Sequence, residues 1–329
     1  MTLPFFQILQ GSSDVTALVG QRNISLSLTD GVGLDADSVT YEIDDKDGII
    51  APPRTGVTIT VIGGYVGRTR NFGQFIVDQV TLSGYPQKIS VSAQSAGAKT
   101  AIKQKRPKSY DKEDYPTYQD IYAEVAGRSG LQLAIASEIG SIKVEYEAQT
   151  EENDLEFATR IGMNLDAHVS VKSNRLIVVK RGAGKSASGA SLGGTIIRSG
   201  VNLIAYSVNV KDTPKHTKVK ATYFDRQKAK REEVEATSGS EGPEFLIREP
   251  FGTKDEAERA AEAKAKDLKR IEGQANFTIE GDPFLMAESI VTAAGIRPLV
   301  DGPWRTTTVT HNWSGSDAYV NEVACEKPE

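Results

Sequence analysis

Three short stretches near the amino terminus decide the fold: ISLSLTDG (residues 24–31), SVTYEIDD (38–45) and GVTITV (56–61). Apolar and polar residues alternate in each of them. In the first, Ile24, Leu26 and Leu28 fall on one side, with serine and threonine on the other. A period of two is that of a β-strand with one buried face. Turn-forming pairs such as Asp47-Gly48 separate the stretches, so they predict antiparallel strands joined by short turns.

The same alternation continues through residues 75–80 and 89–93. We therefore predict that residues 1–105 form one all-β domain, an antiparallel barrel or sandwich. The composition changes after residue 98, where lysines and an arginine cluster around Pro107, and we place the domain boundary there.

A mixed α and β domain is predicted over residues 106–198. Thr117 stands three residues before Asp120, and Asn153 three before Glu156. This is the spacing of a capping box, so a helix is predicted to begin at each site. Strands are expected at residues 168–171 and 175–180. Residues 182–194 are rich in Gly, Ser and Ala and are predicted to form a loop or linker.

A second all-β domain is predicted over residues 199–329. Residues 203–210 and 217–223 have strand patterns and are expected to pair, with 228–235 as a charged, solvated extension. Thr253 and Glu256 open a helix whose buried face is rich in alanine. Strand patterns return at residues 274–279, 289–292, 306–313 and 319–325, so the helix is predicted to lie in an insertion of about 236–273.

Composition excludes several classes of protein. The chain has 329 residues, a formal net charge of −5 and a single cysteine, Cys325. An intrachain disulfide is therefore impossible, and no overall positive field is present to hold nucleic acid. No stretch approaches the ~18 apolar residues of a membrane span, so we expect no membrane anchor.

No motif points to catalysis, a cofactor or a metal. Gly182-Ala-Gly-Lys-Ser186 resembles the end of a phosphate-binding loop, but Val179 stands where the first glycine is required. His168, His216 and His311 lack metal-ligand spacing and are interpreted as ordinary surface or strand histidines. The carboxylates between Asp30 and Asp47 are interpreted as a solvated acidic face. The basic stretches 99–108 and 215–231 favour an exposed face or a protein contact over nucleic-acid binding.

A collinear series of short segments resembles the late control protein D family, whose members form the baseplate hub of contractile phage tails. The resemblance begins with the three opening stretches and GQFIVD (73–78). It continues through QTEENDLEFATRI (149–161), which is similar to a helix of type VI secretion spike proteins, and ends with DGPW (301–304) and VTH (309–311). Ala158 and Gly162 depart from the pattern, where Leu and Ala are usual. The matching residues, to which we assign structural roles, are Asp30, Asp37, Asp45, Gly56, Gly73, Asp154, Phe157, Arg160, Gly302, Trp304 and His311.

The resemblance implies a homotrimer. Each subunit would contribute two tube-like antiparallel β-barrels, with the small α/β domain between them, so that the trimer presents six similar barrels to a hexameric tail tube protein. A trimeric spike protein would bind the opposite end, and baseplate wedge proteins would bind around it. The lumen would admit the tape-measure protein and later DNA. The protein would then reside in the virion, and in the host cytoplasm during assembly.

We accordingly expect a structural hub of a contractile phage tail or tailocin and no enzyme. The acidic stretch from Asp30 to Asp47 is expected near a subunit face or the lumen, where like charge would keep DNA from adhering. The alternative is a cell-wall hydrolase or carbohydrate-binding tail component, suggested by the abundant carboxylates and tyrosines. A third possibility is nucleic-acid binding through residues 215–231.

Overall fold

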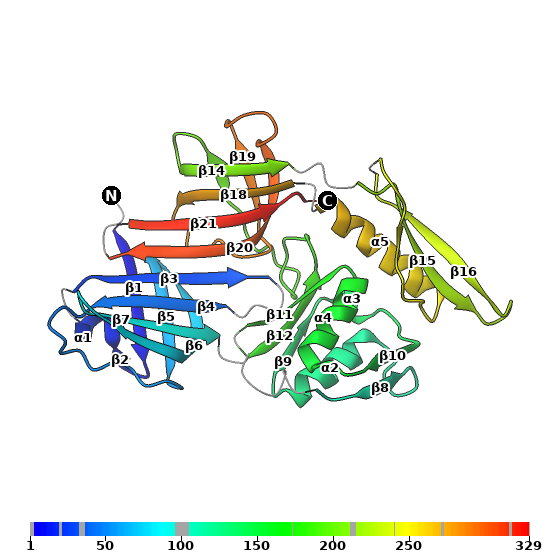
Figure 1. Cartoon of the computed structure of the whole chain (residues 1–329), viewed down its shortest axis with the longest axis horizontal. Helices are drawn as coiled ribbons and strands as arrows, with labels where there is room; N and C mark the ends of the chain where they lie inside the picture. The colour runs from blue at the N-terminus through cyan, green and yellow to red at the C-terminus, as the bar shows by residue number, and fades with distance from the viewer. Residues whose placement is uncertain are drawn as a thin grey trace.

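The computed structural model describes residues 3–19, 22–32, 37–95, 105–172, 174–210, 215–239, 241–270, 273–315 and 318–328. Its main feature is one sheet of 13 strands, which runs through both predicted β regions (Figure 1). The mainly β fold class predicted from the sequence is confirmed. The sequence did not reveal that the two β regions share hydrogen bonds.

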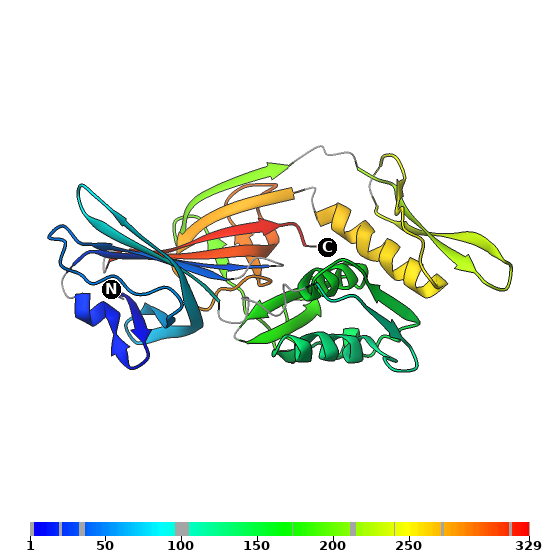
Figure 2. The same ribbon diagram turned by 60° about the horizontal axis from the view of Figure 1, so that its bottom comes forward.

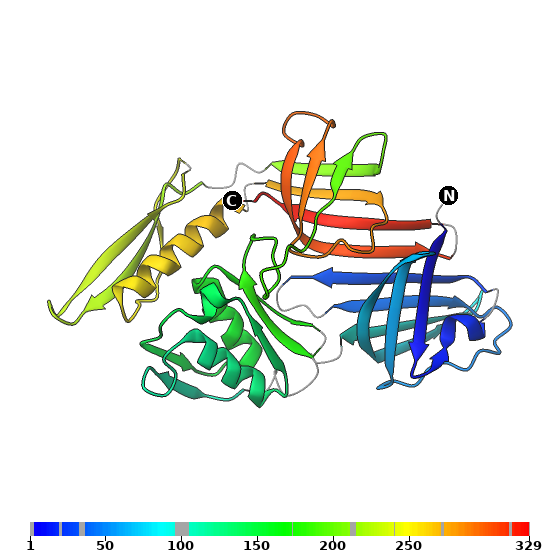
Figure 3. The ribbon, with the colours of Figure 1, turned by 180° about the vertical axis from the view of Figure 1, so that it is seen from behind.

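The first β region supplies seven strands of this sheet and a short helix, α1 (Val15–Val19). The strands are β1 (Pro4–Gln10), β2 (Ser13–Asp14), β3 (Ile24–Gly31), β4 (Ser38–Asp44), β5 (Thr58–Tyr65), β6 (Arg68–Ser83) and β7 (Lys88–Ser95). The first half of β6 pairs with β5 and its second half with β7. Because one long strand serves both pairings, the sheet folds over its own core. In Figure 3, which shows the molecule from behind, β1 and β5 lie in front of β3, β4 and β7.

The second β region is built in the same way around a long strand. Its strands are β13 (Ile196–Arg198), β14 (Leu203–Val210), β18 (Gly273–Glu280), β19 (Ile290–Ala294), β20 (Gly302–Ser314) and β21 (Ala318–Glu326). The start of β20 pairs with β19, and its later part, from Thr308 to Ser314, pairs with β3. This β3–β20 ladder joins the two regions. Apolar packing crosses it as well, since Trp313 and Tyr319 belong to the core of the first region.

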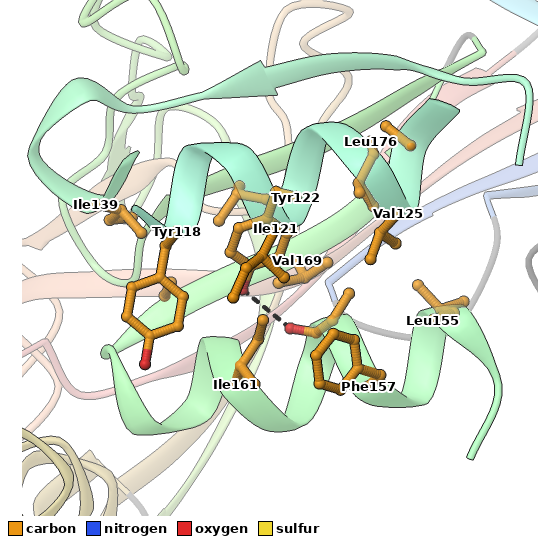
Figure 4. Close-up of a cluster of buried hydrophobic side chains, with 14 of the residues drawn as sticks. Tyr118, Ile121, Tyr122, Val125, Ile139, Leu155, Phe157, Ile161, Val169 and Leu176 are labelled. Carbon is orange, nitrogen blue, oxygen red and sulfur yellow. Dashed lines mark hydrogen bonds between the residues drawn. The ribbon is translucent and has the colours of Figure 1, made fainter. Parts of the chain in front are cut away.

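The middle domain has its own core beneath the sheet. Strands β11 (Ala167–Lys172), β12 (Arg175–Lys180) and β9 (Gln132–Ile135) form a small sheet beside the pair β8 (Lys108–Asp111) and β10 (Tyr146–Gln149). Helices α2 (Tyr118–Arg128) and α4 (Asp154–Asn164) pack on that sheet, with α3 (Ser137–Gly140) nearby. Figure 4 shows the inward stripe of α4, including Ile161, against Tyr122 of α2, whose hydroxyl donates to the Ala158 carbonyl at 3.0 Å. Both predicted capping boxes are present.

The insertion is larger than predicted and forms a projecting arm (Figures 1 and 2). It contains β15 (Lys218–Asp225), β16 (Lys230–Thr237), β17 (Phe245–Leu246) and α5 (Lys254–Arg270). The predicted pairing of 203–210 with 217–223 is wrong, because β14 pairs with β18 and β15 with β16. The stretch 228–235 is largely strand β16, because Val234 and Ala236 give it a narrow apolar face that packs toward the buried alanines of α5. The insertion thereby forms a hydrophobic core of its own.

Candidate functional site

The most extensive polar surface is one face of the large sheet. Eight strands run in the order β14-β18-β21-β20-β3-β4-β7-β6. On each, the alternation turns apolar side chains toward a core and polar ones away from it. We call the outward side the polar face. Neighbouring strands carry there Ser25, Ser27, Thr29, Thr40, Ser90, Ser92, Asn276, Thr278, Thr310 and Asn312.

Hydroxyl groups meet across the strands of the polar face. Thr29 lies 3.3 Å from Thr310 and Thr40 lies 3.4 Å from Ser92, oxygen to oxygen. A hollow of about 410 Å³ lies between these strands, with Ser27 and Asn312 in its lining. The face therefore offers hydroxyl and amide groups over a broad, slightly hollowed area.

Charge on the polar face is mostly negative. Five strand residues with carboxylates share its register: Glu42, Asp44, Glu280, Glu322 and Glu326. In the described part of these eight strands, two cations share this register and both are paired: Lys88 Nζ lies 2.7 Å from Glu42, and Arg305 bonds to Glu326. A surface of this kind offers few partners to phosphate.

The sheet ends at two unpaired edges. Among the residues that the structure describes, strand β14 pairs only with β18, and the second half of β6 only with β7. Both edges carry apolar side chains that extend past the core, since Tyr206 and Val210 of β14 are 41% and 55% exposed and Leu82 of β6 is 64% exposed. An exposed edge strand with apolar side chains is a template for pairing with another chain.

A buried ionic cluster, which we call the Lys172 joint, links the first β region to the middle domain. Lys172, on β11, bonds to Asp30 on β3 and lies 3.2 Å from Asp37, just before β4. The second Asp30 oxygen accepts from the Ala287 amide at 3.3 Å, which adds the second β region to the contact. Three parts of the molecule therefore meet at the Lys172–Asp30 pair.

The two carboxylates of the Lys172 joint have opposite pKa shifts. Burial opposes ionisation of Asp30, but the Lys172 ammonium, with Arg70 behind it, outweighs burial and lowers the pKa of Asp30. Burial raises the pKa of Asp37 to about 6 because its attraction to Lys172 is partly cancelled by repulsion from Asp30. Lys172 therefore stabilises the ionised form of Asp30 more than that of Asp37.

The solvated acidic face predicted for Asp30 to Asp47 is wrong at two positions. Asp30 and Asp45 are each only 6% exposed. Asp30 is held by Lys172, and Asp45 accepts the amides of Ile49 and Ile50, both at 3.1 Å. Buried carboxylates need such partners, and Lys172 comes from a strand 142 residues away, so local sequence could not reveal it. Asp35 lies outside the described residues.

His311 lies near the Lys172 joint in a stack of rings. Its ring stacks on Trp313 and Tyr319, at centroid distances of 5.9 and 6.0 Å. Its Nδ1 is 2.7 Å from both the Tyr319 hydroxyl and the Asn321 amide nitrogen. Burial lowers the pKa of His311 to about 3, so the ring is neutral and structural.

A second group of motif residues lies in the middle domain. Asp154 is fully buried and its Oδ1 accepts from Arg128 at 2.8 Å and from Gln149 at 2.9 Å. Phe157 stacks on Tyr110 with ring centroids 5.2 Å apart. Arg160 lies over the Phe157 ring and pairs with Glu152 at 2.9 Å. These contacts fix α4 against β8 and β10.

The remaining motif residues hold turns and the second core. Gly56 and Gly73 have φ of 86° and 103°, in the region that favours glycine. Gly73 lies at the register shift in the pairing of β6 with β5. Gly302 has φ of 127° at the start of β20. Trp304 is buried in the second core and donates to the Val300 carbonyl at 2.8 Å. The motif residues therefore form several structural clusters and no single pocket.

The other sequence candidates have structural partners. His168 is buried on β11 and His216 is exposed. The Gly182 amide donates to Glu288, and no helix follows Ser186 within the described residues 182–195. In the basic stretch 215–231, Lys218 pairs with Glu235, and Lys228 and Lys230 with Glu232. This stretch presents alternating charge rather than a positive patch.

A groove of about 1,240 Å³ between the middle domain and the arm is lined by seven carboxylate residues. Burial raises the pKa of Glu147 and that of Glu256. Glu147 accepts from the Tyr118 hydroxyl at 3.0 Å, and Glu256 accepts from the Thr253 amide at 3.2 Å to complete the capping box of α5. These bonds give both carboxylates structural roles.

Comparison with known proteins identifies relatives along nearly the full chain, although no family model matches. The probable baseplate hub protein of Escherichia phage 186 is 29% identical over 357 residues, covering 95% of this chain and 90% of the relative. That of Escherichia phage P2 is 29% identical over 350 residues, covering 94% and 89%.

Solved structures share the fold at low identity. A tail protein from Neisseria meningitidis superposes with a TM-score of 0.70 at 12% identity, covering 98% of this chain and 96% of that one. An Escherichia coli component of the type VI secretion system, similar to T4 bacteriophage tail proteins, gives 0.56 at 10% identity, covering 97% and 76%. No helix in the described parts of the chain is long and apolar enough to cross a membrane.

The fold, with its two sheet regions joined edge to edge, is that of the phage tail proteins and their secretion-system counterparts. Within that class, this chain is similar along nearly its whole length to the probable baseplate hub proteins of phages 186 and P2, and the family resemblance found in its sequence is confirmed.

Proposed function

We propose that this protein is the structural baseplate hub of a contractile phage tail or tailocin, acting as a homotrimer that joins a hexameric tail tube to a trimeric spike. The observation that carries the proposal is the sheet itself. Among the described residues it ends in two unpaired apolar edges, and its outer face is polar, with two cations that are both paired to carboxylates. Homology to probable baseplate hub proteins supports the same role.

Pairing of the β14 edge with the β6 edge of another copy would be a head-to-tail contact. Such contacts close into rings when the rotation allows it. At both edges the exposed apolar side chains alternate with outward-facing polar ones, as Leu82 does with Thr81 and Tyr206 with Ser207. The pairing would cover Leu82, Tyr206 and Val210 and extend the polar face without a break. Three copies would make a ring of 24 strands, since each supplies eight.

The polar face would line the lumen of this ring. The tape-measure protein and then DNA would pass along hydroxyl and amide groups with little charge attraction. Of the acidic stretch, Glu42 and Asp44 lie on this face, whereas Asp30 and Asp45 are buried. We propose that the motif residues act structurally, because the hub must keep its shape while partners bind.

The two barrel domains, proposed as residues 1–105 and 199–329, would contact the tail tube protein, and the spike would bind the opposite end. Wedge proteins would contact the outer surface, and the protein would be located in the tail baseplate of the virion. This role requires no chemical reaction.

The hydrolase alternative is tested by a peptidoglycan turnover assay on the wild type and on Glu147→Gln. Wild-type activity that is lost in the variant would support the hydrolase.

The test of the hub proposal is the mass of the purified protein in solution, alone and with the neighbouring spike gene product. The expected species is a trimer that co-purifies with the spike. Leu82→Lys combined with Tyr206→Lys should give monomers, because charge would be buried at each edge. Thr81→Lys combined with Ser207→Lys, on the same strands but facing outward, is the matched control and should stay trimeric. A wild type that is monomeric with and without the spike would contradict the proposal.

A further inference from the structure

A cavity of about 390 Å³ lies where the first β region, the middle domain and the second β region meet. Phe72 and Phe75 of β6 form one wall, Ile177 and Val179 of β12 form another, and the loop of residues 185–192 borders it. Its size is within the roughly 300–1,000 Å³ range of ligand pockets, which favour domain junctions and the mouths of β-barrels.

The deep part of this cavity is electrically balanced. Asp30 and Asp37 face Lys172, and Arg70 adds a second positive charge near Asp30. Glu288, also in the lining, bonds to Arg305 and accepts the Gly182 amide. The interior of the cavity therefore has no unbalanced charge to attract an ion.

The rim of the cavity is positive. Arg175, the first residue of β12, and Lys185 are both exposed and line the opening. Neither has an ion-pair partner among the described residues, although the chain as a whole has a net charge of −5. An apolar cavity with two unpaired cations at its entrance is complementary to a molecule with an apolar body and a negative end.

We propose that this cavity binds an apolar carboxylate, with its aliphatic or aromatic body between Phe72, Phe75 and Ile177 and its carboxylate at Arg175 and Lys185. The site is independent of trimer formation and goes beyond the hub role. The same chemistry has two sources: a free fatty acid, or the carboxyl-terminal residue of a peptide with an apolar side chain.

The experiment is calorimetric titration of the full chain with decanoate and with decanol, which has the same body and no charge. One decanoate should bind per chain, and decanol more weakly. Arg175→Gln combined with Lys185→Gln should weaken decanoate binding by about tenfold and leave decanol unchanged, since two partly exposed ion pairs are removed. Lys180→Gln combined with Arg198→Gln removes two exposed cations elsewhere and should change neither affinity.

A second variant tests the cavity itself. Ala187→Trp places a large side chain into the lining from the loop and should abolish binding of both ligands. Ala190→Trp, in the same loop but outside the lining, should bind as the wild type does. Short peptides ending in Leu-Leu as free acid or as amide distinguish the two sources, because only the acid should bind if a peptide terminus fits.

The proposal is overturned if neither decanoate nor the free-acid peptide binds at millimolar concentration. It is equally overturned if binding survives both Ala187→Trp and loss of the two rim cations. Neither outcome depends on whether the chain forms a trimer, so a failure here is distinct from a failure of the hub proposal.

Discussion

Asp37 is the residue whose replacement should stabilise the protein. Burial raises its pKa from 3.8 to about 6, so the folded protein holds this proton more tightly than the unfolded chain does. The stability it contributes is complete below pH 3.8 and is lost as the pH rises toward 6. A shift of about two units corresponds to about 3 kcal/mol, at 1.36 kcal/mol per unit. Asp37→Asn removes the repulsion between the Asp37 and Asp30 carboxylates and should raise the free energy of unfolding by about 1–3 kcal/mol at pH 7.

Urea unfolding followed by the fluorescence of Trp313 and Trp304 measures this effect at pH 4 and pH 7. The gain of Asp37→Asn should be present at pH 7 and nearly absent at pH 4, where wild-type Asp37 is protonated. Asp78→Asn is the control, because Asp78 is exposed. Asp30→Asn should have the opposite sign at pH 7, since Lys172 loses its main partner. A pH-independent difference, or a variant less stable than the wild type at pH 7, would refute the reasoning.

Three further predictions concern the polar face and the cores. Thr40→Lys combined with Ser92→Lys places two cations on the proposed lumen, and particles carrying it should assemble normally but eject DNA more slowly, as infectivity and ejection assays would measure. Gly281→Ala should destabilise the fold by about 1–3 kcal/mol in thermal unfolding, because the added Cβ would lie 2.2 Å from the Tyr319 ring. Gly31→Ala is the control, because its Cβ would meet no atom within 4 Å and its backbone is not in the left-handed region. Arg128→Met should cost about 3–5 kcal/mol by leaving Asp154 buried without its cation, and Asp154→Asn in the same background should recover part of that loss.

Secondary-structure elements that are specified by residues close together in the sequence could be predicted well. The period-two stretches became β3, β4 and β5 because their alternation fixes which side is buried. The three capping boxes formed where their spacing placed them, since the bonds join residues three apart. The partner of strand 203–210 could not be predicted, because a strand pattern does not identify the strand it pairs with. In the sequence, the whole arm separates β14 from its partner β18.

By itself, the sequence determined the β-rich class, the three longer helices α2, α4 and α5, and the family resemblance, because alternation, caps and collinear motifs are local or ordered along the chain. Tertiary structure alone decided that β3 and β20 join the two β regions, that Asp30 and Asp37 share Lys172, and that the sheet ends in two apolar edges. Those features depend on residues more than a hundred positions apart. Their free energy comes from burial and charge neutralisation, which exist only once the distant strands have met.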